Sequence, residues 1–257
     1  MTIDFSKPMT VYELLALILS VSALLYPLLK YFYNRFFRRI KIRFFPSGRM
    51  TIFFNKSGPY VSIGGVYEVK HKPAVIREVT AKIVRKTDQA TLSLVWSTFS
   101  SPVVTKKAGG YETTFETAHP FKVDADTLGP AFIEFENTTE DIAKKIEEAT
   151  SPVIWKSMNT MIPQGNYLAA IQEIRESSEA HDAFISINDE FFWKHSDYEI
   201  QLYTKYNNSV YTTRYLFDLS EEDSNKLRSN INSIIEDNIV QRYGGNPIFY
   251  SIRKNLV

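Results

Sequence analysis

An uninterrupted apolar run near the N-terminus constrains this chain more than any other feature. Residues 14 to 29, LLALILSVSALLYPLL, carry no charged side chain. As an α-helix rising about 1.5 Å per residue, this run alone covers about 24 Å, and its extension over residues 11 to 33 reaches the roughly 30 Å of hydrocarbon in a bilayer. The sequence therefore predicts a single transmembrane helix.

Two other interpretations of the run remain open: a cleaved signal peptide and a core helix of a soluble protein. A signal peptide needs a positively charged start and a small-x-small cleavage site beyond its apolar segment. The start of this chain mixes Lys7 with the acids Asp4 and Glu13, and the best cleavage match, residues 21 to 23, lies inside the run. A retained signal-anchor is therefore favoured.

Cations and aromatic rings follow the run together. This combination is typical of a membrane interface, because amphipathic rings and long cationic side chains settle at the headgroups. Residues 1 to 39 are therefore interpreted as tail, span and basic helical stem, with anionic lipid as a partner. Nucleic acid is disfavoured there, since headgroups would occupy the stem first. The side chains predicted to contact the membrane surface are Lys30, Tyr31, Arg35, Phe36, Arg38, Arg39, Lys41 and Arg43.

The distribution of charge predicts the orientation of the span. The formal net charge of +1 hides a segment between Glu13 and Glu68 that contains cations and no acid. Because cations close to a span stay in the cytoplasm, we expect the N-terminus outside and the C-terminal domain on the cytoplasmic side of a plasma or inner membrane. The chain has no cysteine, which excludes disulfides and thiolate metal sites and fits a reducing compartment.

Residues 40 to 257 are predicted to form one β-rich α+β domain. Apolar residues alternate with polar ones through several segments between residues 40 and 99, which is typical of strands that bury one face. A helical insertion is expected at about residues 138 to 182. A C-terminal amphipathic helix is expected at about residues 221 to 242, with Ser220 as its N-cap.

Two further segments are predicted as strands. Residues 183 to 192 are expected to return the chain to the sheet after the insertion. Residues 198 to 218 read as a hairpin that turns at Asn207 and Asn208, because asparagine tolerates the positive φ angles of tight turns.

Two features of this order resemble an immunoglobulin-like or fibronectin-type sandwich. Trp96 stands at about the spacing of the core tryptophan in such folds, and residues 197 to 200, DYEI, look like the tyrosine corner before a penultimate strand. The resemblance implies a β-sandwich with Trp96 in its core. The cysteine pair of such domains is missing, and a mixed α+β domain of another topology is the alternative.

The sequence contains no recognisable catalytic, cofactor or metal motif. His181-Asp182 and His195-Ser196-Asp197 place an imidazole next to a carboxylate, whereas a catalytic triad brings its members together from distant segments. The glycines do not have the spacing of a phosphate-binding loop. We therefore predict no catalytic residue, no cofactor and no metal ligand, in a protein that is not an enzyme.

Residues 100 to 129 are predicted as a long segment of loops with one irregular strand. Long structured loops in compact domains are usually functional or disordered, and exposed rings dominate many protein interfaces. The candidate partner-binding residues of this loop are Tyr111, Phe115 and Phe121.

Two functional hypotheses follow. The first is a single-pass protein that holds a β-rich domain at the cytoplasmic face to bind or sense a protein partner. The second is a membrane effector, in which a signal received by the domain makes the span form a homo-oligomer and perturb the bilayer. Small residues in the span, Ser20, Ser22 and Ala23, would permit the close helix contacts that the second hypothesis needs.

Overall fold

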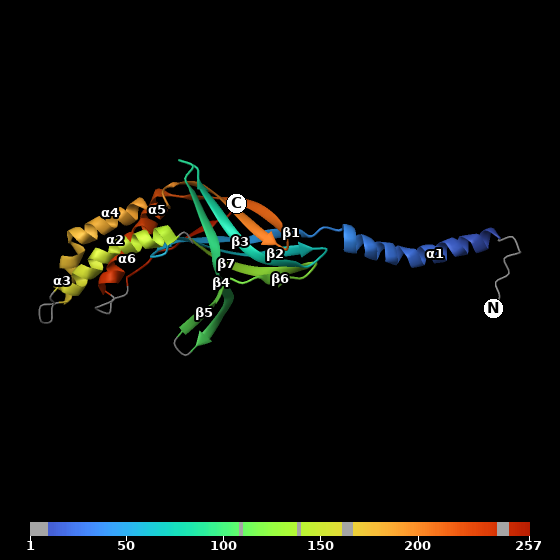
Figure 1. Cartoon of the computed structure of the whole chain (residues 1–257), viewed down its shortest axis with the longest axis horizontal. Coiled ribbons are helices and arrows are strands. Elements are labelled where there is room, and N and C mark those ends of the chain that lie inside the picture. The colour runs from blue at the N-terminus through green and yellow to red at the C-terminus, as the bar shows by residue number, and fades with distance from the viewer. Residues whose placement is uncertain (1–9, 108–109, 138–139, 161–166, 241–246) are drawn as a thin grey trace.

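The computed structural model describes residues 10–107, 110–137, 140–160, 167–240 and 247–257. Three parts follow one another along the long axis of the molecule (Figure 1): an isolated helix at one end, a curved sheet in the middle and a group of helices at the other end. The sheet therefore separates the apolar helix from the helical group.

The isolated helix, α1 (Val11–Phe32), begins at a capping box formed by Thr10 and Glu13. It is 22 residues long, contains Pro27 and has no buried residue. Its most apolar window has a mean hydropathy of 1.9, so α1 could cross a membrane by its length and composition. The basic stem, expected as a continuous helix over residues 30 to 39, differs in its second half. The α-helix ends at Phe32, and a π-helical turn, η1 (Tyr33–Phe37), follows it.

The strands belong to one ten-stranded antiparallel sheet. Its main path runs β10-β1-β2-β7-β4-β3-β8-β9, with β5 added to β4 and β6 to β3. The strands are β1 (Lys41–Asn55), β2 (Gly58–Lys70), β3 (Ala74–Arg85), β4 (Thr91–Lys107), β5 (Gly110–Thr117), β6 (Phe121–Val123), β7 (Thr127–Glu136), β8 (Ser196–Tyr206), β9 (Ser209–Leu219) and β10 (Ile252–Asn255).

The two edges of this sheet approach each other, so the sheet nearly closes into a barrel. The backbone N–H of Leu216 on β9 donates to the carbonyl of Val257 at 2.9 Å, and the N–H of Val257 donates back at 3.1 Å. The Tyr215 hydroxyl donates to the carbonyl of Phe44 on β1 at 2.9 Å. The expected immunoglobulin-like sandwich is not confirmed. The alternating pattern in the sequence shows only that one face of each strand is covered. A sheet that curls onto itself covers that face as well as two stacked sheets do, so the pattern does not distinguish the two architectures.

Side chains at every second position fill the interior of the sheet. On β2 the side chains of Val61, Ile63, Tyr67 and Val69 share one face and are fully buried. Gly65 interrupts this row because the Phe44 ring lies against it, and a Cβ there would approach Phe44 Cζ to 2.5 Å. The predicted burial of Trp96 is confirmed: its side chain is 8% exposed, and its ring centroid lies 4.4 Å from that of Phe99.

Five helices form the group at the far end, which we call the helical cap. The N-terminal part of the cap is the predicted insertion, and it extends further along the chain than expected. Residues 183 to 192 are predicted as a strand, but residues 183 to 189 instead continue helix α4, because Ala180, Ala183 and Ile187 recur at helical spacing and are buried on one face. Residues 190 to 192 follow the end of α4 and belong to no strand. The helices are α2 (Glu140–Asn159), α3 (Tyr167–Arg175), α4 (Ser178–Asp189), α5 (Glu221–Arg228) and α6 (Asn230–Val240).

The single C-terminal amphipathic helix expected at residues 221 to 242 is not confirmed. The predicted N-cap Ser220 does begin α5 with Asp223 as its capping-box partner, but α5 ends at Arg228 and α6 begins at Asn230. The Asn230 amide is buried and donates to the carbonyl of Phe54 at 3.1 Å and to that of Tyr250 at 2.7 Å. This tie to the sheet holds the break between the two helices.

The segment from residue 100 to 129 is also more regular than predicted. It consists mainly of strands β4 to β7, and the outer half of β4 pairs with β5 from Thr98↔Thr117 to Lys107↔Gly110. This pair projects from the body of the sheet as a two-stranded arm (Figure 1). Its polar, threonine-rich sequence alternates too weakly to reveal the strands.

Candidate functional site

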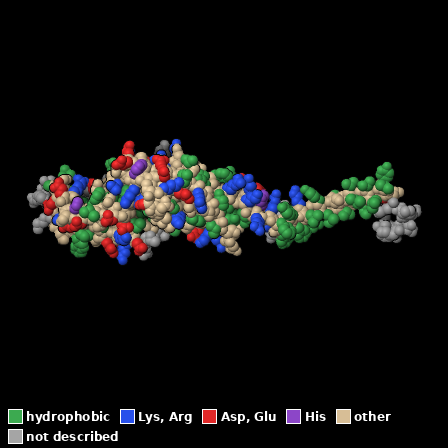
Figure 2. Space-filling view, turned by 90° about the horizontal axis from the view of Figure 1, so that it is seen from above, with side chains coloured by type: hydrophobic (Ala, Val, Ile, Leu, Met, Phe, Trp, Pro, Cys, Tyr) green, Lys and Arg blue, Asp and Glu red, His purple; other side chains and the backbone are tan. Residues whose placement is uncertain are grey.

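The predicted membrane-contact residues gather where α1 meets the sheet. Figure 2 shows a group of Lys and Arg side chains at this junction, next to the apolar surface of α1. The side chain of Arg35 lies outside the described part of the chain. The other predicted contacts are all exposed: Lys30, Tyr31, Phe36, Arg38, Arg39, Lys41 and Arg43.

The π-helical turn stacks aromatic rings along the side of the stem. The ring centroids of Phe32 and Phe36 lie 5.9 Å apart, and those of Tyr33 and Phe37 lie 6.1 Å apart. Lys30 Nζ lies 5.9 Å from the centroid of the Tyr26 ring. Rings with cations beside them suit the boundary between hydrocarbon and headgroups, where one end of a side chain is apolar and the other is wet.

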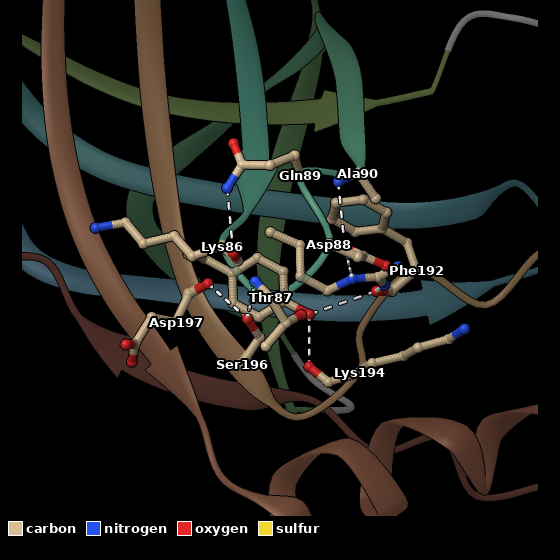
Figure 3. A network of polar contacts seen from close by, with 11 residues as sticks. Lys86, Thr87, Asp88, Gln89, Ala90, Phe192, Lys194, Ser196 and Asp197 are labelled. Carbon is tan, nitrogen blue, oxygen red and sulfur yellow. Dashed lines mark hydrogen bonds and ion pairs between the residues drawn. The ribbon is translucent and has the colours of Figure 1, made fainter.

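At the opposite end of the sheet, the buried Arg85 ties the sheet to the segment between α4 and β8. Figure 3 shows the polar network around it, with Asp88 and Phe192 labelled. The guanidinium of Arg85, at the end of β3, donates to Asp88 with its Nε at 2.9 Å and its Nη2 at 2.6 Å. Its Nη1 donates to the carbonyl of Phe192, and its charge lies 5.1 Å from the centroid of the Phe192 ring. The bond from Arg85 lowers the pKa of the Asp88 carboxyl below its ordinary value.

Tyr198, predicted as the tyrosine corner of a sandwich that is not confirmed, completes this junction. Its hydroxyl donates to the carbonyl of Lys194 at 2.5 Å, four residues upstream, and burial is the main cause that raises the pKa of its phenol to about 12. Next to it, Trp193 is fully buried and its indole N–H donates to the carbonyl of Phe53 at 2.9 Å. These contacts fix the chain between α4 and β8, so we assign the junction a structural role.

The two segments that place an imidazole next to a carboxylate lie on separate elements: His181-Asp182 is on α4, and His195-Ser196-Asp197 is at the start of β8. His195 Nδ1 donates to the carbonyl of Leu219 at 2.8 Å, which gives it a structural partner. His181 and Asp182 lie exposed on α4, and His181 lines a cleft of about 590 Å³ between α4 and α6 that an Arg175–Glu236 ion pair crosses. Among the residues that the structure describes, no group of three or more His, Cys, Asp or Glu side chains could hold a metal ion.

An exposed tryptophan distinguishes the outer surface of the cap. Trp155 on α2 is 65% exposed, and Met158, one helical turn further, is 58% exposed. Trp155 lines a cleft of about 650 Å³ together with Pro152, Lys156, Asn159, Thr160, Glu173 and Glu179. We call the surface formed by Pro152, Trp155, Met158, Glu173 and Glu179 the cap face.

Acidic residues dominate the cap around this face, as Figure 2 shows toward the end of the molecule away from α1. Lys156 Nζ is the nearest cation and is paired with Glu179 at 3.2 Å. Residues 167 to 190 contain a single cation, Arg175, and six acids, which are Glu173, Glu176, Glu179, Asp182, Asp189 and Glu190. Sequence reasoning missed the cap face, although the order of Pro152, Trp155 and Met158 at helical spacing was a usable signal.

The three rings proposed as a partner-binding loop have different positions. The side chains of Tyr111 and Phe115 lie outside the described part of the chain. Phe121 on β6 is half-buried and packs against the core, with its ring centroid 5.9 Å from that of Trp96 and 6.1 Å from that of Tyr67. Only part of the Phe121 ring is therefore open to a partner.

Comparison with known proteins adds no functional information. No protein-family model matches the chain, and no curated protein matches it. Among solved structures, it is similar to a family 123 glycoside hydrolase from Clostridium perfringens, studied for glycolipid glycan hydrolysis, with a TM-score of 0.30 and 6% identity. That alignment covers 71% of this chain and 27% of the hydrolase chain, and a likeness this low carries no argument about fold or activity.

Proposed function

We propose that this chain is a single-pass, membrane-anchored binding protein with no catalytic activity of its own. In this proposal α1 holds the chain in a plasma or inner membrane with its N-terminus outside, and the β-rich domain stands on the cytoplasmic side. The orientation is supported by the cations that directly follow the span, since such cations resist transfer across the membrane.

The partner surface in this proposal is the cap face, and the observation that carries it is the exposure of Trp155. Trp96 and Trp193 are 8% and 0% exposed, whereas Trp155 is 65% exposed at the far end of the domain from α1. A tryptophan buries a large apolar area when a partner covers it, which is why tryptophan is enriched among the residues that dominate protein interfaces.

The charge around Trp155 defines the chemistry of the partner. Glu173 and Glu179 lie in the same cleft as the indole, and acids outnumber cations along α3 and α4. A complementary protein partner would carry Lys or Arg around an apolar side chain, as a basic amphipathic segment does.

Site-directed photocrosslinking in native membranes tests this function. A photoreactive phenylalanine analogue in place of Met158 should join the full-length chain to one protein, which mass spectrometry of the band identifies. Trp155→Ala in the same chain should reduce the crosslinked band at least fivefold. Phe45→Ala is the matched control, because Phe45 is an aromatic residue of the sheet wall that is 45% exposed, and it should leave the band unchanged.

Two outcomes would contradict the proposal. An unchanged band with Trp155→Ala would remove the cap face as the partner surface. Release of a trapped dye from proteoliposomes that contain the chain would favour instead the membrane effector, whose span oligomerises.

A further inference from the structure

The register of the sheet brings three turns to the end from which β1 begins. Lys41 pairs with Lys70, so the β2–β3 turn lies at this end. Val69 pairs with Thr127, which places the β6–β7 turn beside it, and Ile76 pairs with Tyr206, which adds the β8–β9 turn. We call residues 70–75, 122–128 and 205–210 the basal rim.

The connection to α1 keeps the basal rim close to the end of the span. Only Arg38, Arg39 and Ile40 separate η1 from β1, and three extended residues reach about 10 Å. The headgroup region of a bilayer is about 5 to 8 Å deep on each side. If α1 spans the membrane, the domain cannot move away from the headgroups by much more than their own depth.

Exposed apolar side chains on the rim stand beside charged ones. Leu128 is 63% exposed, Val210 57% and Val75 36%. In the register, Val75 lies opposite Lys122, Val210 opposite Lys205, and Leu128 opposite Glu68. Val75 and Val210 thus stand beside lysines, and Leu128 stands beside Glu68, which pairs with Lys70. Apolar tips with lysines near them are typical of surfaces that enter a bilayer interface, where the tips reach the acyl boundary and the ammonium groups bind lipid phosphates.

The charge balance at this end favours an anionic surface. Three of the rim lysines form ion pairs within the domain, Lys70 with Glu68 at 3.0 Å, Lys122 with Asp124 at 2.6 Å and Lys205 with Glu78 at 2.8 Å. Exposed pairs of this kind contribute about 0 to 1 kcal/mol, so these lysines can turn to lipid phosphates at low cost. The acids Glu68, Glu78, Asp124 and Asp126 balance the rim lysines Lys70, Lys72, Lys122 and Lys205. The net positive charge at this end therefore comes from Arg38, Arg39, Lys41 and Arg43, which directly precede the rim.

We propose that the basal rim is a second membrane contact, which binds anionic lipid headgroups and inserts Leu128 and Val210 into the interface. This inference rests on the proposed anchoring by α1. The contact holds the barrel upright, and β2, which has 13 residues, would then raise the helical cap about 30 Å above the headgroups, given roughly 3.3 Å per residue and the usual tilt of barrel strands. The cap face would meet its partner at that height.

Fluorescence quenching in nanodiscs tests the rim with the full-length chain. Because the chain has no cysteine, Asn208→Cys provides a unique site for a fluorophore in the β8–β9 turn. A probe at Ile248→Cys is the control: Ile248 is 69% exposed, and its carbonyl accepts a bond from Ser233 on α6 in the cap. In nanodiscs with about one third phosphatidylserine, lipids that are spin-labelled at the headgroup should quench the Asn208 probe at least twice as strongly as the control.

Variants then separate the charge from the apolar part of the contact. Lys72→Gln, Lys122→Gln and Lys205→Gln together should lower the quenching of the Asn208 probe to the control level. Leu128→Asn with Val210→Asn should lower it by about half. Both variants should keep the thermal transition of the parent, since all five side chains lie on the surface or at its edge.

Equal quenching of the two probes in phosphatidylserine nanodiscs would overturn the inference. The inference would also be overturned if the Asn208 probe were quenched as strongly in discs of phosphatidylcholine alone as in discs with phosphatidylserine, because the contact would then need no anionic lipid. Failure of the anchor itself has a different signature: a chain whose α1 does not span would not remain in the nanodisc during size-exclusion chromatography.

Discussion

At the end of the sheet next to α1, a group of lysines and arginines lies near exposed apolar side chains, whereas the helical cap at the other end is acidic and exposes an indole. The same core cluster continues from the sheet into the cap, so packing alone does not require this difference. Opposite charge at opposite ends suits a domain that lies on an anionic membrane on one side and meets a basic partner on the other. The surfaces, more than the barrel, therefore point to function.

The largest effect is expected from the stem cations, which should control the orientation of α1 in the membrane. An alkaline phosphatase fused after Val257 should be inactive in a bacterial host, because it stays in the cytoplasm. Replacing all the stem cations by Gln should produce phosphatase activity, because it removes the positive charge that keeps this end in the cytoplasm and the attraction of about 1 kcal/mol per cation to an anionic leaflet. Activity of the unaltered fusion would contradict the proposed orientation. The residues replaced are Lys30, Arg35, Arg38, Arg39, Lys41 and Arg43.

Two tryptophans of the cap end should respond very differently to truncation. Trp193→Ala should lower the free energy of unfolding by about 3 to 5 kcal/mol, because it removes a fully buried ring and the bond to the Phe53 carbonyl. Trp155→Ala should change it by less than about 0.5 kcal/mol, as expected for an exposed position. Urea unfolding in detergent, followed by circular dichroism, measures both. Comparable losses would mean that Trp155 serves packing and is unavailable to a partner.

A smaller effect is expected at the tyrosine corner. Tyr198→Phe keeps the buried ring and deletes the hydroxyl bond to Lys194, so stability should fall by about 1 kcal/mol. The same unfolding experiment measures this loss. Tyr203→Phe is a suitable control, because its hydroxyl bonds only the side chain of Gln201 on the half-buried outer face, and its effect should be smaller.

The smallest effect is a dependence of stability on pH at the sheet–cap junction. The bond from Arg85 lowers the pKa of Asp88 in the folded chain, so the contribution of Asp88 is present above the unfolded pKa of about 3.9 and is lost as pH falls through the lower folded pKa. Asp88→Asn should lower the melting temperature at pH 7 and flatten its decline below about pH 4. A decline identical to that of the parent would exclude Asp88 as its cause.

Some of the fold could be predicted from short-range signals. The capping box at Thr10 and the Ser220 N-cap act through contacts three residues apart, so sequence alone locates them. The Asn207 turn has a positive φ of 47°, as the asparagine predicts. The candidate cap face is harder to predict from sequence, because the exposure of Trp155 depends on which face of α2 the neighbouring helices cover.

The secondary-structure predictions that failed lie where contacts between distant parts of the chain decide the structure. The strand predicted at residues 183 to 192 competes with a helix there, and the helix prevails where α4 packs against α2 and α6 with Ala183 and Ile187 buried. The break between α5 and α6 depends on the Asn230 bonds to Phe54 and Tyr250, which no local pattern reveals.

The sequence by itself determined an apolar helix long enough for a bilayer, the cations behind it and the alternation that makes strands, because each depends on neighbours along the chain. Only the tertiary structure decided that the sheet curls until Leu216 meets Val257, and that the β2–β3, β6–β7 and β8–β9 turns share the end next to α1. Strand order and register join residues that lie far apart in sequence, so the surfaces they create become visible only when the chain has folded.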